Sequence, residues 1–282
     1  MMARQLIEKT IRNFLNTVTD NDIYNEFSMQ HELGIKLREE FEKYNTVNNC
    51  HFVVQFERNR RFFGINDPTP IISKTYIPKS EIDIVVYDKN GTEDKTKWEK
   101  YAIELKYPLN GQVPNQMYSF LKDICFCEKL VDNGQNDFDV AFAVALVNDK
   151  DFYYQKTKPI YPYPYPYGYF RFCDTIRPRI MPVPTGKQSK IDFEITGTYK
   201  IVWNDAKGIA DKNNRSNANG KYYLLSIDKV KYHKVYPKEV EVLLQKHINE
   251  IDNGDFDCLL SEAQEQGIYL DIMEVLKDAK VF

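Results

Sequence analysis

The sequence predicts an α/β protein in which a mixed β-sheet is flanked by helices. In some segments apolar residues recur every three or four positions, as on the buried stripe of a helix. In others they alternate or run without interruption, as in strands. These segments follow one another in the order helix, three strands, helix, strand, with further strands and helices after them. That order is typical of a sheet covered by helices.

The N-terminal elements are the clearest. Residues 24–44 carry the apolar stripe of an amphipathic helix. A strand at 51–57 runs into a basic, aromatic stretch, and the proline-rich residues 67–80 are expected to form a loop. Strands at 81–88 and 101–108 follow, joined by a polar hairpin connection that contains an Asn-Gly pair.

The later elements are predicted from the same two periodicities. They are a helix at 117–131, an almost continuously apolar strand at 138–147, strands at 197–203 and 222–227, and helices at 237–251 and 255–277. No low-complexity linker separates them. We therefore expect a single domain over residues 1–282, with a core at about 24–150 and additional C-terminal strands and helices at about 151–282.

Composition narrows the class of protein. The sequence contains no apolar run of membrane-spanning length, and its first residues lack the apolar centre of a signal peptide, so a cytoplasmic protein with no membrane partner is expected. Its five scattered cysteines favour reduced thiols over disulfides or a zinc site. A net charge of −3 gives no overall attraction to nucleic acid. Binding to DNA would need local positive charge or metal ions.

Residues 161–169 alternate tyrosine and proline, which favours an extended backbone and excludes a central strand. Two interpretations stay open. The segment is either a rigid surface loop or an aromatic platform on which nucleobases stack.

Ionisable residues interrupt two of the predicted strands. Glu104 and Lys106 lie on one face of their strand, and the hairpin places Asp83 on the neighbouring strand beside them. A carboxylate pair of this kind suits Mg²⁺, with Mn²⁺ as a substitute, and a nearby lysine can orient water or stabilise a phosphate. The alternative is a solvated strand face with a cross-strand salt bridge.

Ile82-Asp83 together with Glu104-Leu105-Lys106 resembles the motif of the PD-(D/E)xK nuclease superfamily, which includes restriction endonucleases and repair or recombination nucleases. In this sequence an isoleucine precedes the aspartate. The resemblance extends over residues 26–147. It implies a restriction-endonuclease-like fold with an α-β-β-β-α-β core.

The resemblance also implies roles for single residues. Asp83, Glu104 and the carbonyl oxygen of Leu105 would hold the metal, and Lys106 would position the attacking water. Glu32, on the first predicted helix, matches an extra acidic residue that some members carry, and the alternative is a solvated surface glutamate.

Residues that could contact the substrate are predicted next to these strands. Arg58, Arg60 and Arg61 could neutralise DNA phosphates, and Gln116 resembles a glutamine that some members place near the site. The alternatives are solvated loop charge for the arginines and a helix-start polar residue for the glutamine.

The sequence thus predicts a Mg²⁺-dependent DNA endonuclease of the type II restriction kind. Two alternatives stay open. One is a repair or recombination nuclease that acts on DNA structure, and the other is a catalytically silent nucleic-acid or protein-binding module of the same fold. Assembly as a homodimer is also left open.

Overall fold

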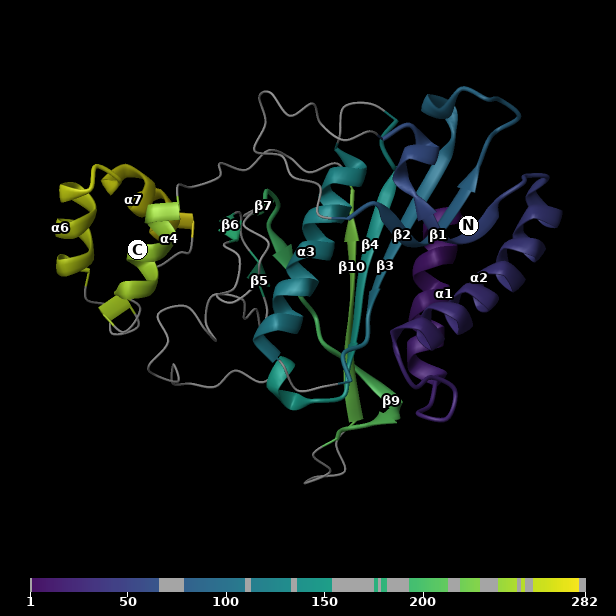
Figure 1. Cartoon of the computed structure of the whole chain (residues 1–282), viewed down its shortest axis with the longest axis horizontal. Helices are drawn as coiled ribbons and strands as arrows, with labels where there is room; N and C mark the ends of the chain where they lie inside the picture. The colour runs from purple at the N-terminus through teal and green to yellow at the C-terminus, as the bar shows by residue number, and fades with distance from the viewer. Residues whose placement is uncertain are drawn as a thin grey trace.

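A six-stranded mixed β-sheet lies at the centre of the protein, with helices on both of its faces (Figure 1). This computed structural model describes residues 2–65, 79–109, 113–132, 136–153, 175–176, 179–181, 193–212, 219–228, 238–247, 250–251 and 256–278. The strands, in sheet order, are β1 (Val53–Asn59), β2 (Glu81–Asp88), β3 (Glu99–Lys106), β4 (Val140–Val147), β10 (Asn219–Ile227) and β9 (Asn204–Ala210). The predicted α/β class with a mixed sheet flanked by helices is confirmed.

Three helices sandwich the sheet. Helices α1 (Ala3–Thr17) and α2 (Glu26–Asn48) cover one face, and α3 (Val113–Val131) covers the other (Figure 1). Alternate residues of the strands point to the two sides, so that Ile103 packs with α1 and α2 whereas Ala102 packs with α3. Each face therefore has its own apolar core.

The central strands follow the predicted order. β1, β2 and β3 form an antiparallel meander, and β4 lies parallel to β3 after the crossover through α3. β4 is buried along its whole length, as the continuous apolar run at 138–147 predicted. The chain thus brings the C-terminal end of β3 directly beneath α3.

Local hydrogen bonds fix where α2 begins. The side chain of Asn25 accepts a hydrogen bond from the Ser28 backbone N–H at 2.7 Å, and Ser28 Oγ accepts one from the Asn25 N–H at 3.0 Å. This reciprocal cap satisfies donors that the first helical turn leaves unpaired. It places Glu26 in that first turn.

Short elements complete the sheet region. They are the 3-10 turns η1 (Arg60–Phe63), η2 (Lys95–Lys97) and η3 (Lys150–Phe152), and the strand pairs β5 (Thr175–Ile176) with β8 (Tyr199–Lys200) and β6 (Arg179–Met181) with β7 (Phe193–Ile195). The predicted strand at 197–203 was wrong in extent, because only β8 forms there and β9 begins after it. The Tyr-Pro segment at 161–169 lies outside the described residues.

A buried carboxylate ties the segment between β7 and β8 to α3. Glu128 accepts hydrogen bonds from the backbone N–H groups of Thr196 and Gly197 and from the hydroxyl of Tyr199, with Tyr199 at 2.7 Å. Because those three donors satisfy a charge that burial would otherwise penalise, the contact holds this segment against the helix.

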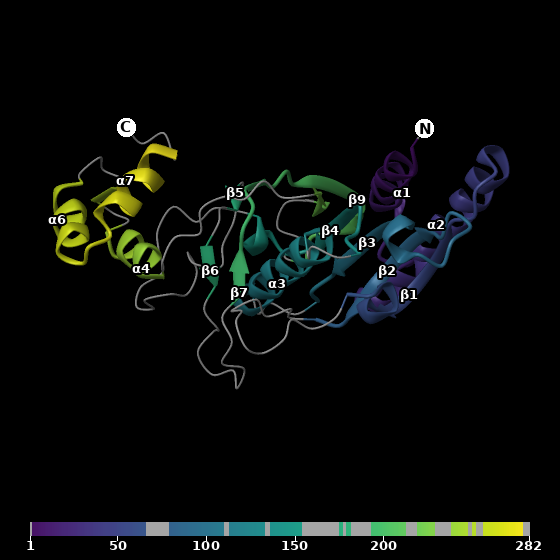
Figure 2. The same cartoon turned by 90° about the horizontal axis from the view of Figure 1, so that it is seen from above.

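The C-terminal helices pack around a core of their own. They are α4 (Lys238–Lys246), α6 (Asp257–Glu265) and α7 (Tyr269–Asp278), and they lie at the opposite end of the molecule from α1 and α2 (Figure 2). The single helix predicted at 255–277 was wrong, because Gly267 takes a left-handed φ of 72° and separates α6 from α7.

Organisation as one domain stays a prediction. Among the described residues, no helix combines the length and the apolar character that a membrane crossing requires.

Candidate active site

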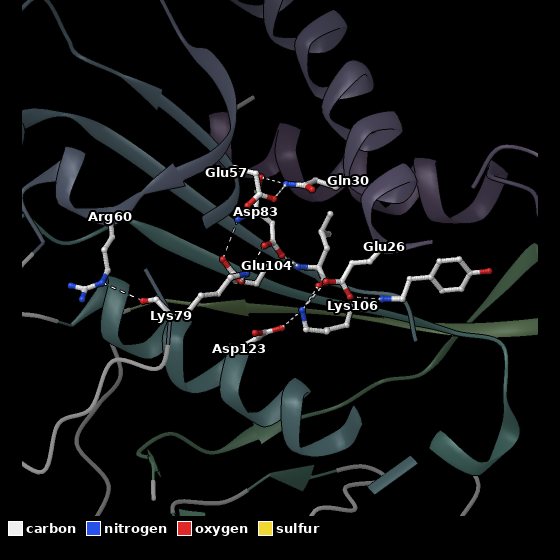
Figure 3. A network of polar contacts seen from close by, with 11 residues as sticks. Glu26, Gln30, Glu57, Arg60, Lys79, Asp83, Glu104, Lys106 and Asp123 are labelled. Carbon is white, nitrogen blue, oxygen red and sulfur yellow. Dashed lines mark hydrogen bonds and ion pairs between the residues drawn. The ribbon is translucent and has the colours of Figure 1, made fainter. Parts of the chain in front are cut away.

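Acidic and basic side chains meet where β2 and β3 separate, between α2 and α3 (Figure 3). Asp83 comes from β2, and Glu104 and Lys106 come from β3. Asp83 is 7% exposed and Glu104 is 1% exposed, which excludes the alternative of a solvated strand face. The structure therefore brings these three sequence-predicted residues together.

The two carboxylates replace backbone pairing between the strands. The β2–β3 ladder ends at Ile84 opposite Ile103. Beyond that point Asp83 Oδ2 accepts a hydrogen bond from the Leu105 N–H at 2.8 Å, and Glu104 Oε1 accepts one from the Asp83 N–H at 3.3 Å. Each carboxylate thus has one oxygen fixed by the neighbouring strand.

The remaining oxygen of each carboxylate contacts Lys79. Its ammonium donates to Asp83 Oδ1 and, at 2.6 Å, to Glu104 Oε2. Burial by itself would lower the pKa of Lys79, but the charges of Glu104 and Asp83 outweigh it, and the pKa is raised above its usual range. A single cation thus sits where both carboxylates converge.

Lys106 is held by a second set of acids. Its Nζ lies 2.9 Å from Glu26 Oε1 on α2 and 3.1 Å from Asp123 Oδ2 on α3, and it donates to the Leu105 carbonyl at 3.0 Å (Figure 3). Glu26 also accepts from the backbone N–H of Tyr107. The predicted metal-binding carbonyl of Leu105 therefore accepts a hydrogen bond from Lys106 here.

Helix α2 also holds the backbone beside Asp83. Gln30 donates to the Asp83 carbonyl and, at 2.7 Å, to Glu57 Oε1 (Figure 3). Glu57 has a φ of +48°, and the pairing between β1 and β2 skips this position, which is where the strand would otherwise face Asp83. A non-glycine residue in this conformation is strained, which is common near functional sites.

Burial sets the ionisation of the cluster. It raises the pKa of Glu104 well above the usual value, and the charge of Asp83 adds to that effect. Burial also raises the pKa of Asp123 to about 6, although Lys106 and Lys79 act in the opposite direction. For Lys106, the charges of Asp123 and Glu26 outweigh the effect of burial and raise the pKa, so its side chain is an ammonium ion at neutral pH.

The raised pKa of Asp123 predicts a pH-dependent contribution to stability. An unfolded aspartate has a pKa of about 3.9, so between about pH 4 and pH 6 the folded protein binds this proton more tightly than the unfolded chain does. The contribution of Asp123 to the free energy of unfolding therefore falls as the pH rises from about 4 to about 6. We expect the free energy of unfolding of Asp123→Asn, relative to wild type, to rise by about 1 to 3 kcal/mol between pH 4 and pH 7.

Urea unfolding of both proteins at a series of pH values, with a chelator present, measures this difference. Taking the difference removes the titration of carboxylates far from the substitution. A constant difference across the series would contradict the assignment of the raised pKa to Asp123.

Two predicted site residues lie elsewhere. Glu32 lies 3.6 Å from the ring of His31, its side chain is 42% exposed, and the structure does not bring it to the cluster. Arg60 is 1% exposed and donates to the backbone carbonyls of Lys79 and Ile65. The prediction that Arg60 contacts DNA was wrong, because its guanidinium is buried and bonded to backbone.

The other predicted substrate contacts are closer to the surface. Arg58 is half-buried, with its guanidinium 3.6 Å from the centre of the Phe62 ring. Arg61 is exposed in η1, and Gln116 is half-buried in the first turn of α3. These three stay predictions as substrate contacts.

The sequence interpretation missed Lys79, Glu26, Gln30 and Asp123. Two of them carried a readable signal. Asp123 lies on the apolar stripe of α3, three residues after Phe120, where a charge requires a partner. Gln30 lies on the apolar stripe of α2, three residues before Leu33. Periodicity does not mark the other two, because Glu26 stands near the start of a predicted helix and Lys79 in a predicted loop.

The donor set fits a magnesium ion held by few protein ligands. Asp83 Oδ1 and Glu104 Oε2 already converge on one cation, and Mg²⁺ is commonly bound by one or two carboxylates with water as its other ligands. Within the described part of the chain, no cluster of three or more His, Cys, Asp or Glu side chains is arranged to hold a metal ion.

Comparisons with protein-family models, with curated proteins and with solved structures found no match to this chain.

Proposed function

We propose that this protein is a Mg²⁺-dependent DNA endonuclease with a site of the PD-(D/E)xK kind on a restriction-endonuclease-like fold. One observation carries the proposal: Asp83 and Glu104 converge on a single cation from neighbouring strands, with Lys106 two residues further along. The element order α2-β1-β2-β3-α3-β4 agrees with the α-β-β-β-α-β core that the resemblance implies.

The charge of the cluster supports a divalent ion. The two lysines contact four carboxylates, those of Asp83, Glu104, Glu26 and Asp123. Burial raises the pKa values of Glu104 and Asp123, and a bound divalent ion would favour their ionised forms. With all four carboxylates ionised, four negative charges against the two positive ones of the lysines would leave two negative charges. Asp83 and Glu104 would hold the ion, which supplies Lewis-acid stabilisation of the phosphoryl oxygens when it is bound.

Lys106 contributes positive charge. Its raised pKa keeps the side chain protonated, so it cannot take a proton from water at neutral pH. Held by Glu26 and Asp123, the ammonium would stabilise negative charge on the phosphate and orient the attacking water. Water then adds to phosphorus and loses a proton, the bond to the 3′ oxygen breaks and that oxygen gains a proton, which leaves a 5′-phosphate.

Digestion of plasmid DNA tests the proposal. The purified protein is incubated with supercoiled plasmid, branched DNA and single-stranded DNA, in Mg²⁺, in Mn²⁺ and in chelator. Discrete bands from the plasmid that depend on the metal are the result expected for a restriction enzyme. Cutting restricted to branched or single-stranded DNA would instead indicate a repair or recombination nuclease.

A third outcome would overturn the proposal. If no DNA is cut although the protein binds DNA or a protein partner, the fold serves as a catalytically silent module. The proposal includes a cytoplasmic location, where DNA and Mg²⁺ are both present, and it leaves assembly as a homodimer to measurement of the molecular mass in solution.

A further inference from the structure

We propose that Lys79 is a competitor for the metal ion: its ammonium occupies the position between Asp83 and Glu104 that Mg²⁺ takes, so that binding of the ion requires Lys79 to leave. This inference rests on the proposed function. It adds a residue that neither the motif nor the sequence periodicity indicates, and it assigns that residue a part in controlling the site.

The argument begins with the oxygens that are engaged. Asp83 Oδ2 is held by the backbone N–H of Leu105, and Glu104 Oε1 is held by that of Asp83. The oxygens that converge on one point are Asp83 Oδ1 and Glu104 Oε2, and both contact Lys79 Nζ. A metal ion that bridges the two strands would use the same two oxygens, because the other two are committed to backbone.

Electrostatic repulsion prevents the Lys79 ammonium and a divalent cation from lying together between the two converging oxygens. An ammonium ion and a divalent cation a few ångströms apart repel strongly in a buried site, where solvent screens little. Lys106 differs from Lys79 in this respect, because its ammonium contacts Glu26, Asp123 and the Leu105 carbonyl and does not contact the converging oxygens. Lys79 is therefore the group that must move.

The backbone of Lys79 is anchored while its side chain can turn away. Arg60 Nε donates to the Lys79 carbonyl at 3.3 Å, and the Arg60 N–H donates to the Ser80 carbonyl at 2.9 Å. Lys79 precedes β2, and 27% of its side chain is exposed, so the side chain is not fully enclosed by the residues that the structure describes. Departure then needs rotation of a flexible side chain and no change in the sheet.

Titration calorimetry of DNA-free protein with Mg²⁺ and with Mn²⁺ tests the proposal. Lys79→Met removes the charge and nearly keeps the length of the side chain. We expect it to bind the metal about 5-fold to 150-fold more tightly than wild type, the usual range for coupling between two sites. Lys79→Arg keeps the charge and is expected to bind like wild type. Lys43→Met, which removes an exposed lysine paired with Glu40 on α2, controls for the general loss of a lysine and is expected to change nothing.

Unchanged or weaker metal binding by Lys79→Met would overturn the inference. Cleavage assays in parallel separate this failure from failure of the proposed function. If wild type cuts DNA but Lys79→Met gains no affinity, the inference fails and the function stands. If Lys79→Met gains affinity but neither protein cuts any DNA substrate, the inference stands and the function fails.

A second measurement uses wild-type protein and does not depend on how well the variant folds. Brief acetylation followed by mass spectrometry reports the reactivity of each lysine. Lys79 is expected to react slowly without metal, because its ammonium is paired, and several-fold faster with saturating Mg²⁺. Lys43 provides the internal reference. Equal labelling of Lys79 in both conditions would overturn the inference.

Discussion

Glu104→Gln and Asp83→Asn are each expected to reduce DNA cleavage by at least about a hundredfold while the protein still folds and binds DNA. Each change replaces a charged oxygen ligand with a neutral amide of the same shape. Glu104 is 1% exposed and its pKa is raised by burial and by Asp83, so removing one of the two charges relieves repulsion in the folded protein. Each amide also turns its NH2 group toward a hydrogen-bond donor, because both oxygens of each carboxylate accept hydrogen bonds, so cleavage is compared at a temperature where the variants are folded.

Single-turnover cleavage, thermal unfolding and gel shift in the presence of chelator measure the three quantities separately. Glu93→Gln is the matched control, because Glu93 is 85% exposed in the hairpin between β2 and β3 and pairs with Lys89. It is expected to behave like wild type in all three assays. Full cleavage by either site variant would contradict the assignment of Asp83 and Glu104 as metal ligands.

Lys106→Ala is expected to lose cleavage by two or more orders of magnitude, about what a charge-stabilising or water-orienting group supplies. Binding of Mg²⁺ and DNA should be at least as strong as in wild type, because an ammonium near the carboxylates repels the ion and does not hold it. The substitution separates a nuclease from a protein that only binds metal, since only in a nuclease would loss of this lysine stop cleavage while the metal still binds.

Calorimetric metal titration and single-turnover cleavage on the same preparation decide the matter. The variant leaves Glu26 and Asp123 without their shared partner, so thermal unfolding is followed as well. Normal cleavage would make Lys106 a structural ion-pair partner. Loss of metal binding together with loss of the fold would also remove its proposed catalytic role.

Local periodicity was sufficient to predict the central strands. The strand at 81–88 was predicted with the bounds that β2 has, whereas β3 begins and ends two residues before the strand predicted at 101–108. The predicted hairpin placed the two strands side by side, as the structure does. Asp83 and Glu104 could therefore be paired from sequence, because neighbours in a hairpin face each other regardless of the rest of the fold.

Tertiary packing decided what the sequence could not. Asp123 and Glu26 reach Lys106 from helices on opposite faces of the sheet, and their distance from it depends on how those helices pack. Arg60 looked like a DNA contact because arginines are usually exposed, yet the turn that follows β1 directs it inward to backbone carbonyls. Glu32 was placed on the correct helix, but its side chain is partly exposed and contacts His31.

Glu26 and Gln30 lie one turn apart on α2, and together they hold both strands of the site. Glu26 binds Lys106 and the Tyr107 backbone at the end of β3, while Gln30 binds the Asp83 carbonyl on β2. One helix is therefore hydrogen-bonded to both strands that carry the site. A partner or ligand that tilted α2 would displace Asp83 and Lys106, the proposed metal ligand and the proposed catalytic lysine, in a single movement, so that the proposed activity could be switched from a surface that touches neither residue.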